Sequence, residues 1–144
     1  MKVKIVNKSS KILPNYSTEF STGLDLRANI DEDILLKSLD RVLIPTGLFI
    51  QLLGGVEAQV RQRSGLALKH GISKVNTPGT IDSDYRGEIG EILIKLSKDD
   101  FVVKNGDRIC QMIIDRHENI EWEEVDNLEV SARGEGGFGH TGNK

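Results

Sequence analysis

The sequence has a single cysteine, Cys110, among 144 residues. One cysteine cannot form a disulfide within the chain, so the composition excludes a disulfide-stapled secreted scaffold and favours a reducing compartment. Cys110 stands among Ile109, Met112 and Ile113. Because cysteines in apolar surroundings usually behave as small buried hydrophobes, we predict that Cys110 is a structural thiol.

Aromatic residues and long apolar runs are also scarce. Only 5% of the residues are aromatic, so a core must be built from Ile, Leu and Val. The first ten residues, MKVKIVNKSS, contain no apolar run suited to a signal peptide, and no segment approaches the length of a membrane span. From the sequence we therefore expect a cytoplasmic protein with no membrane partner. Its length suits one domain, which would bury about 68–70% of the unfolded surface.

Positive charge is not in excess, because the formal net charge is −3. Binding to a polymeric nucleic acid depends largely on Lys and Arg that neutralise phosphates. The charge therefore predicts no nucleic acid partner. A small phosphorylated ligand remains compatible, since it needs only a few cations and backbone amides.

Alternation of apolar residues with period two dominates the chain. One face of the stretch 41–53 carries Val42, Ile44, Leu48, Ile50 and Leu52, the next run has Val56, Ala58 and Val60, and a third has Ile92, Ile94 and Leu96. A short apolar run surrounds Ile109 and Ile113. Short runs bounded by Gly, Pro, Asn or Asp predict strands, and a series of them predicts an all-β sandwich or barrel.

The segment from Ser64 to Gly71 is the exception, and it predicts one short helix. Its first residue is a favoured N-cap, its last is a favoured C-terminal glycine, and Leu, Ala and Lys lie between them. Arg63, Ser64 and Gly65 then stand where a strand turns into a helix, which is a typical anion site. The alternative is that Ser64 only caps the helix and Arg63 is solvated.

A second candidate site lies between Asn76 and Gly87. Pro78-Gly79 and the residues from Asp84 to Gly87 are turn signals around a short strand, so this segment predicts a hairpin whose backbone edge is open to a planar base. Asp82 and Asp84 would share a strand face, an arrangement suited to activating a water or holding a hydrated cation. The alternative is a surface hairpin with acidic turns.

The third candidate is the C-terminal segment from Arg133 to Gly142. It has five glycines in ten residues, and Phe138 is its only aromatic residue. Free amides at glycines can wrap phosphates, and an isolated Phe can fold onto a base. We predict a β domain over residues 1–132 followed by a flexible lid over residues 133–144. The alternative is a disordered tail.

The three histidines, His70, His117 and His140, are scattered and have no zinc-type spacing. We therefore expect no direct side-chain metal ligand. Magnesium that is held by phosphates and water remains compatible with the sequence, because it needs few protein ligands.

Five segments together resemble the signature motifs of the trimeric dUTPase family, in the family's order. They are Ser21–Ala28, Arg63–Ala67 continuing through 69–72, Gly79–Glu88, Gly106–Gln111 and Arg133–Gly142. The resemblance implies a distorted jelly-roll-like β-barrel with one short helix, assembled as a homotrimer with shared active sites. It implies hydrolysis of dUTP to dUMP and pyrophosphate with Mg²⁺, which keeps uracil out of DNA and supplies dUMP for thymidylate synthesis.

The resemblance also implies residue roles. Asp82 matches the aspartate that deprotonates the attacking water, and Tyr85 matches the tyrosine that packs on deoxyribose and excludes a 2′-hydroxyl. Uracil would be read by Asn76 and by the backbone of Gly79, Thr80, Ile81 and Asp82. Phosphates would be held by Arg63, Ser64, Gly65 and Gln111, with Asp25 and Gln111 supporting the hydrated metal. The lid would use Arg133, Phe138, His140 and Thr141.

The motifs depart from the family pattern at Thr22, Gln62 and His140. We expect His140, where the family commonly has Ser, to bind the γ-phosphate; otherwise Thr141 and the glycine amides would do so. Two other classes of protein are alternatives. A dCTP deaminase would need a catalytic glutamate and a different base-reading edge, and a non-catalytic regulator on the same scaffold would be favoured if Asp82 or the tail were missing.

Overall fold

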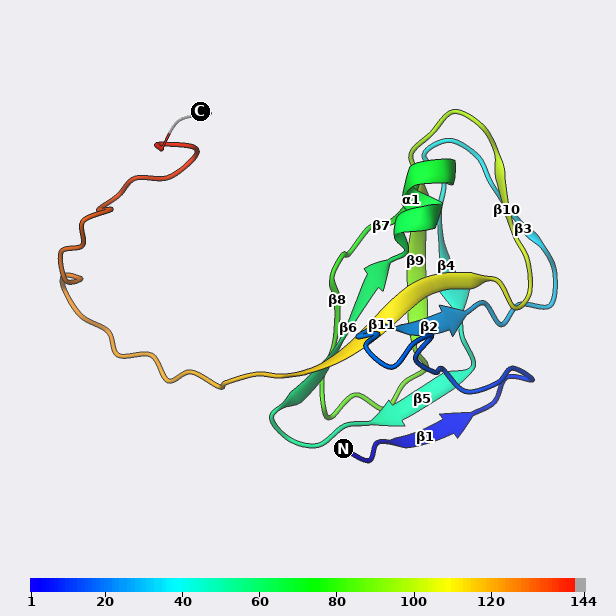
Figure 1. Cartoon of the computed structure of the whole chain (residues 1–144), viewed down its shortest axis with the longest axis horizontal. Helices are drawn as coiled ribbons and strands as arrows, with labels where there is room; N and C mark the ends of the chain where they lie inside the picture. The colour runs from blue at the N-terminus through cyan, green and yellow to red at the C-terminus, as the bar shows by residue number, and fades with distance from the viewer. Residues whose placement is uncertain (142–144) are drawn as a thin grey trace.

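The computed structural model describes residues 1–141, and in them the chain folds into eleven strands and one short helix. The strands are β1 Lys4–Asn7, β2 Leu24–Arg27, β3 Ile34–Leu36, β4 Arg41–Pro45, β5 Leu48–Gln51, β6 Val56–Gln62, β7 Ile72–Lys74, β8 Gly79–Ile81, β9 Gly90–Lys95, β10 Phe101–Val103 and β11 Arg108–Arg116. All pairings are antiparallel. The all-β prediction is confirmed (Figure 1).

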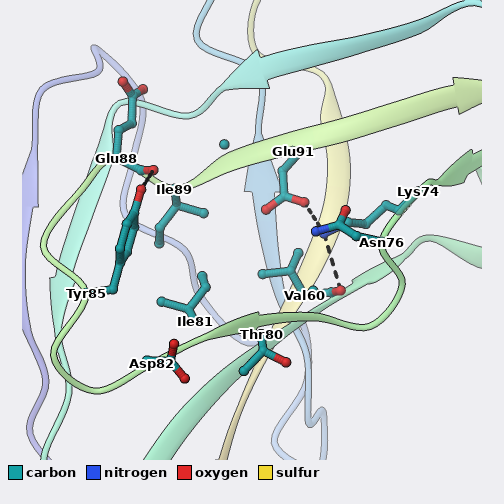
Figure 2. Close-up of a pocket in the computed structure, with 12 residues that line it drawn as sticks. Val60, Lys74, Asn76, Thr80, Ile81, Asp82, Tyr85, Glu88, Ile89 and Glu91 are labelled. Atoms are coloured by element: carbon teal, nitrogen blue, oxygen red, sulfur yellow. Dashed lines mark hydrogen bonds and ion pairs between the residues drawn. The ribbon is translucent and has the colours of Figure 1, made fainter.

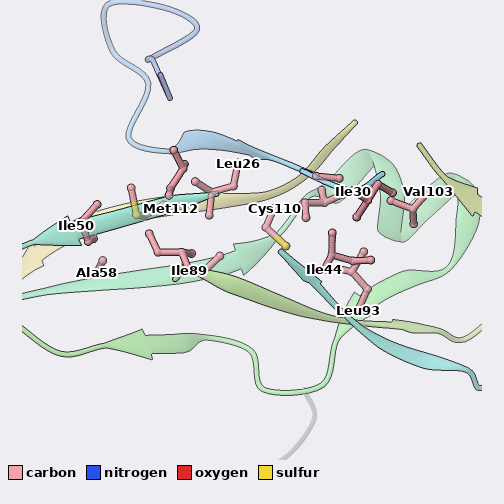
Figure 3. Packing of buried hydrophobic residues seen from close by; sticks show 14 of the residues in the cluster. Leu26, Ile30, Ile44, Ile50, Ala58, Ile89, Leu93, Val103, Cys110 and Met112 are labelled. Carbon is pink, nitrogen blue, oxygen red and sulfur yellow. The ribbon is translucent and has the colours of Figure 1, made fainter. Parts of the chain in front are cut away.

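Two sheets position the residues of interest. One has the order β2-β11-β6-β8 and the other β4-β9-β7. The buried cluster between the strands is almost wholly aliphatic (Figure 3). Cys110 is fully buried in it, as predicted, and burial raises the pKa of its thiol. The alternation in β6 is also confirmed, because Val56, Ala58 and Val60 are at most 2% exposed.

In β9 the buried face of the strand is the opposite of the one that its isoleucines suggest. Ile92 and Ile94 are only half-buried, whereas Glu91, Leu93 and Lys95 are at most 1% exposed. The charged residues therefore lie on the inner face. They can do so because each is paired: Glu91 with Lys74, and Lys95 with the carbonyl of His70.

The helix α1, Ser64–His70, has the predicted length and the predicted C-terminal glycine, with Gly71 at φ 59°. Its start differs from the prediction. The N-cap is Arg63, in extended conformation, and no side chain caps the helix, so Ser64 is already helical. The side chain of Arg63 instead reaches across the sheet to Asp25.

The C-terminal arm, which we define as residues 118–141, leaves the body after β11 and has no strand or helix (Figure 1). Within residues 1–141, the last hydrogen bond that ties this end of the chain to the body runs from His117 N to Gly55 O at 3.2 Å, just before the arm begins. The body thus ends near residue 117, well before the glycine-rich segment begins. No helix in the described part of the chain is long and apolar enough to cross a membrane.

Candidate active site

A pocket of about 170 Å³ opens between the outer edge of β8 and the start of β9 (Figure 2). β8 is the last strand of its sheet, so one backbone edge has no strand partner. Gly79, Thr80, Ile81, Asp82, Asn76 and Tyr85 all line this pocket, together with Val60, Lys74, Glu88, Ile89, Gly90 and Glu91. The volume is below the roughly 300–1,000 Å³ of sites for whole drug-sized ligands, so it suits a single base.

Tyr85 forms one end of the pocket and is held there by its own loop. Its hydroxyl donates to the carbonyl of Glu88 at 3.0 Å, and Glu88 in turn accepts from the amide of Gly47 at 2.7 Å. The ring packs so closely on Gly87 that a Cβ there would collide with it. Tyr85 is 46% exposed, so it remains available to a ligand.

Asp82 lies at the same end as Tyr85, one residue beyond the end of β8 (Figure 2). The prediction that Asp82 and Asp84 share a strand face is wrong. The chain turns immediately after Ile81, with Tyr85 N bonded to Asp82 O at 3.1 Å, and Asp84 is not among the residues that line the pocket. A single exposed carboxylate, Asp82, therefore faces the pocket mouth.

A second cluster, which we call the Asp25 cluster, joins β2, β11 and the start of α1. Asp25, with a side chain 10% exposed, accepts bonds from Arg63 Nε at 3.0 Å, Arg108 Nη1 at 3.0 Å and Gln111 Nε2 at 3.4 Å. Arg63 Nη1 also donates to the carbonyl of Arg108 at 3.2 Å. The cluster holds two guanidinium groups beside the exposed Ser64 and Gly65, where open space surrounds the glycine.

Asp82 and the Asp25 cluster lie toward opposite ends of β6 within one chain. Ile81 pairs with Ala58, and at about 3.3 Å per residue the five residue steps from Ala58 to Arg63 span about 17 Å. The Arg63 guanidinium is displaced further, because its partners lie on β11 and β2, across β6 from β8. The Asp82 carboxylate and the Arg63 guanidinium of one chain therefore lie well apart.

The tail residues are far from both clusters in sequence and make few contacts. Arg133 Nε donates to the carbonyl of Gly136 at 2.8 Å, and Phe138 is fully exposed. His140 packs near Gly136, and Thr141 is the last described residue. Gly142, the last residue of the fifth motif, lies outside the described part. The structure thus gathers the second and fourth motifs with Asp25 and builds the pocket from the third, but joins the fifth to neither.

The described residues contain no group of three or more His, Cys, Asp or Glu side chains that could hold a metal ion. The Asp25 carboxylate is the acid nearest the guanidinium groups. A carboxylate has about four lone-pair sites, and three donors already occupy Asp25. One position remains for a hydrogen bond from a water, which fits a hydrated cation better than direct ligation.

Comparison with known proteins gives these clusters a context. The family model described as dUTPase matches residues 9–142. The chain belongs to the dUTPase family. Curated relatives named deoxyuridine 5'-triphosphate nucleotidohydrolase are similar over nearly their whole length: one from Finegoldia magna is 56% identical, covering 99% of both chains, and one from Fusobacterium nucleatum is 51% identical, covering 99% of this chain and 97% of that one.

Solved dUTPase structures share the fold. A dUTPase from Staphylococcus bacteriophage 80alpha, described with dUPNHPP, has a TM-score of 0.86 at 21% identity over 98% of both chains. A dUTPase variant from S. aureus phage phi11, described with a structural Mg(II) ion, has a TM-score of 0.81 at 16% identity over 90% of this chain and all of that chain. The jelly-roll-like β fold implied by the motifs is therefore confirmed.

The sequence assigns no role to Lys74, Glu91 or Arg108, which belong to the pocket or the Asp25 cluster. Arg108 lies inside the fourth motif, so its position in that motif could have indicated a role. Lys74 and Glu91 did not stand out, because charged residues in strands normally face solvent.

Proposed function

We propose that this chain hydrolyses dUTP to dUMP and pyrophosphate, by attack of water on the α-phosphorus, in the cytoplasm. The observation that carries the proposal is the convergence of Asn76, Asp82 and Tyr85 on one base-sized pocket along the free edge of β8. Family membership supports the same reaction.

In the proposed mechanism Asp82 orients a water at the pocket mouth and takes its proton. Exposed carboxylates are suited to this role when they lie within hydrogen-bond reach of the water, about 3 Å. Asp82 meets the requirement of access, because it is exposed and lies beside Tyr85 at the end from which the phosphates must emerge. Phosphoryl transfer then depends mainly on positioning and charge neutralisation.

Arg63, Ser64, Gly65 and Gln111 would hold the phosphates, with amides at the start of α1 and the fork of Arg63 as donors. Asp25 and Gln111 would support a hydrated magnesium ion through its waters. Bound magnesium would neutralise charge on the triphosphate and on the departing pyrophosphate. The single free acceptor position on Asp25 supports an indirect role of this kind.

We propose that three copies assemble so that the pocket of one faces the Asp25 cluster of another. The separation of Asp82 from Arg63 within one chain supports this arrangement. The arm supports it too, because its apolar side chains have no packing partner in a single copy. These exposed residues are Ile120, Trp122, Val125, Leu128 and Val130. A patch of this kind marks an interaction surface, and a neighbouring copy would cover it.

The lid residues Arg133, Phe138, His140 and Thr141 would close over the bound nucleotide, with Phe138 on the base and His140 or Thr141 at the γ-phosphate. Five glycines around them leave backbone amides free to approach phosphates. Residues 118–132, about 50 Å long if extended, give the lid ample reach to another copy's pocket.

Pyrophosphate release from dUTP, UTP, dCTP and dTTP tests the proposed function. We expect dUTP to be hydrolysed with kcat/KM at least about 10²-fold above the others, because Tyr85 leaves no room for a 2′-hydroxyl and the β8 edge is committed to uracil. Chelation of magnesium should depress turnover of dUTP sharply. Comparable kcat/KM for dUTP and UTP would refute the role of Tyr85, and pyrophosphate release from none of the four would refute the proposed function.

A further inference from the structure

A buried ion pair, Lys74 with Glu91, lies at the inner end of the base pocket (Figure 2). Lys74 ends β7 and Glu91 belongs to β9, and their side chains are only 2% and 1% exposed. Burying two charges is costly, and well-packed apolar residues of similar volume are often at least as stable. Fold stability alone therefore gives a weak reason for placing a lysine against the pocket.

The Lys74 ammonium is held at the start of the β8 edge. It donates to the Glu91 carboxylate and to the carbonyl of Val60 at 3.3 Å. A Cβ built on Gly79 would lie 3.1 Å from Nζ, so the ammonium sits directly against the first residue of β8. An ammonium has three donors, and residues 1–141 supply acceptors for two. The third N–H is available at the pocket.

The orientation of the pocket decides which atom of a base meets that N–H. Tyr85 and Asp82 stand at one end, and Lys74 and Asn76 stand at the other (Figure 2). In a pyrimidine nucleotide the C4 substituent lies across the ring from N1, which carries the sugar. A nucleotide with its sugar beside Tyr85 therefore directs its C4 substituent toward Lys74. That substituent is an accepting oxygen in uracil and a donating amino group in cytosine.

We propose that Lys74 is a specificity-determining residue whose ammonium donates a hydrogen bond to O4 of the uracil base. Glu91 acts as the positioning residue that holds the ammonium in place. The inference rests on the proposed function and adds a selective contact to it. A cytosine amino group would place a donor against a buried cationic donor, which leaves both without an acceptor and rejects the base.

The surroundings of Glu91 suit this positioning role. Burial raises the pKa of its carboxyl, while the hydrogen bond and the charge of Lys74 oppose that rise. The carboxylate is thus fixed between the core and the ammonium. Lys74 cannot swing to solvent without leaving a buried carboxylate unpaired.

The test uses the full chain and a double variant, Lys74→Met with Glu91→Leu, so that neither charge is left unpaired. We expect kcat/KM for dUTP relative to dCTP to fall about tenfold or more, in line with the loss of a hydrogen bond from a charged donor. A thermal melt and light scattering should show an intact fold and assembly. Lys95→Met is the matched control, because Lys95 is equally buried on β9 but does not line the pocket. It should lower the melting temperature and leave the ratio unchanged.

Binding of dUMP, 4-thio-dUMP and 2-thio-dUMP locates the contact without turnover. Sulfur accepts hydrogen bonds weakly, so the wild-type protein should bind 4-thio-dUMP more weakly than dUMP, by about tenfold, whereas the double variant should show no such gap. The 2-thio analogue should not reveal this difference. A 4-thio penalty of equal size in both proteins, or an unchanged dUTP-to-dCTP ratio, would overturn the inference. Only failure of the wild-type protein to hydrolyse dUTP would overturn the proposed function itself.

Discussion

Asp82→Asn lowers kcat for dUTP by about 10²-fold or more while leaving KM nearly unchanged, as expected for loss of a general base. Asparagine keeps the shape of the side chain and its place at the pocket mouth, so binding of the nucleotide should survive. What is lost is the ability to accept the proton of the attacking water. Steady-state pyrophosphate release at fixed free magnesium measures both parameters.

Asp84→Asn is the matched control for this prediction. Asp84 is exposed in the same turn and carries the same charge, but it does not line the pocket. It should therefore retain most of the activity. Equal losses in the two variants would show that the charge of the turn, rather than the base at Asp82, supports turnover.

Removal of the chain from Arg133 onward lowers turnover by about 10²-fold without changing assembly or melting temperature. The expected size follows from positioning, because displacing a substrate by even about 1 Å can lower the reaction rate about 10²-fold. The deleted segment holds Phe138 and the glycine amides, and none of its residues up to Thr141 belongs to the core. Closing lids exclude water and complete a site, so their loss affects the reaction more than the fold. Activity, circular dichroism melts and light scattering on the truncated chain measure the three properties.

A longer deletion, from Glu118 onward, separates the lid from the rest of the arm. It also removes Trp122 and its apolar neighbours, which are exposed in a single copy. If a neighbouring copy covers them, this deletion weakens assembly as well as activity. Full activity in the shorter deletion would make the glycine-rich segment a dispensable end, and unaltered assembly in the longer one would remove the role proposed for the arm.

Local patterns predicted those parts of the fold in which each residue follows its usual preference. Val56, Ala58 and Val60 alternate and are buried, and Gly71 ends the helix in the left-handed conformation that glycine favours. β9 could not be assigned in this way. Because Ile92 and Ile94 are far more hydrophobic than Glu91, the sequence pattern places them on the inner face. The inner position of Glu91 is tolerated because its charge is paired with Lys74 from another strand.

The site was predictable in its residues but not in its arrangement. The motifs single out both Asp82 and Arg63, yet the sequence does not show that the two residues lie toward opposite ends of β6 within one chain. The residue at which the arm begins could not be predicted from the sequence either. Residues 118–132 contain no glycine, and Ile120, Trp122, Leu128 and Val130 alternate with acidic residues in two short runs that resemble strands. Only the tertiary structure shows this segment leaving the body.

Mixing two inactive variants tests the shared site most directly. Asp82→Asn retains an intact Asp25 cluster, and Arg63→Ala retains an intact pocket, with Asp25 still paired to Arg108 and Gln111. The two chains are produced together with different tags, and the mixed assemblies are isolated and assayed for pyrophosphate release from dUTP. If each site combines Asp82 of one chain with Arg63 of the next, every mixed ring of three regains one intact site, so the isolated mixed assemblies should recover about a third of the sites. Activity no greater than that of the two variants assayed separately would contradict the shared site.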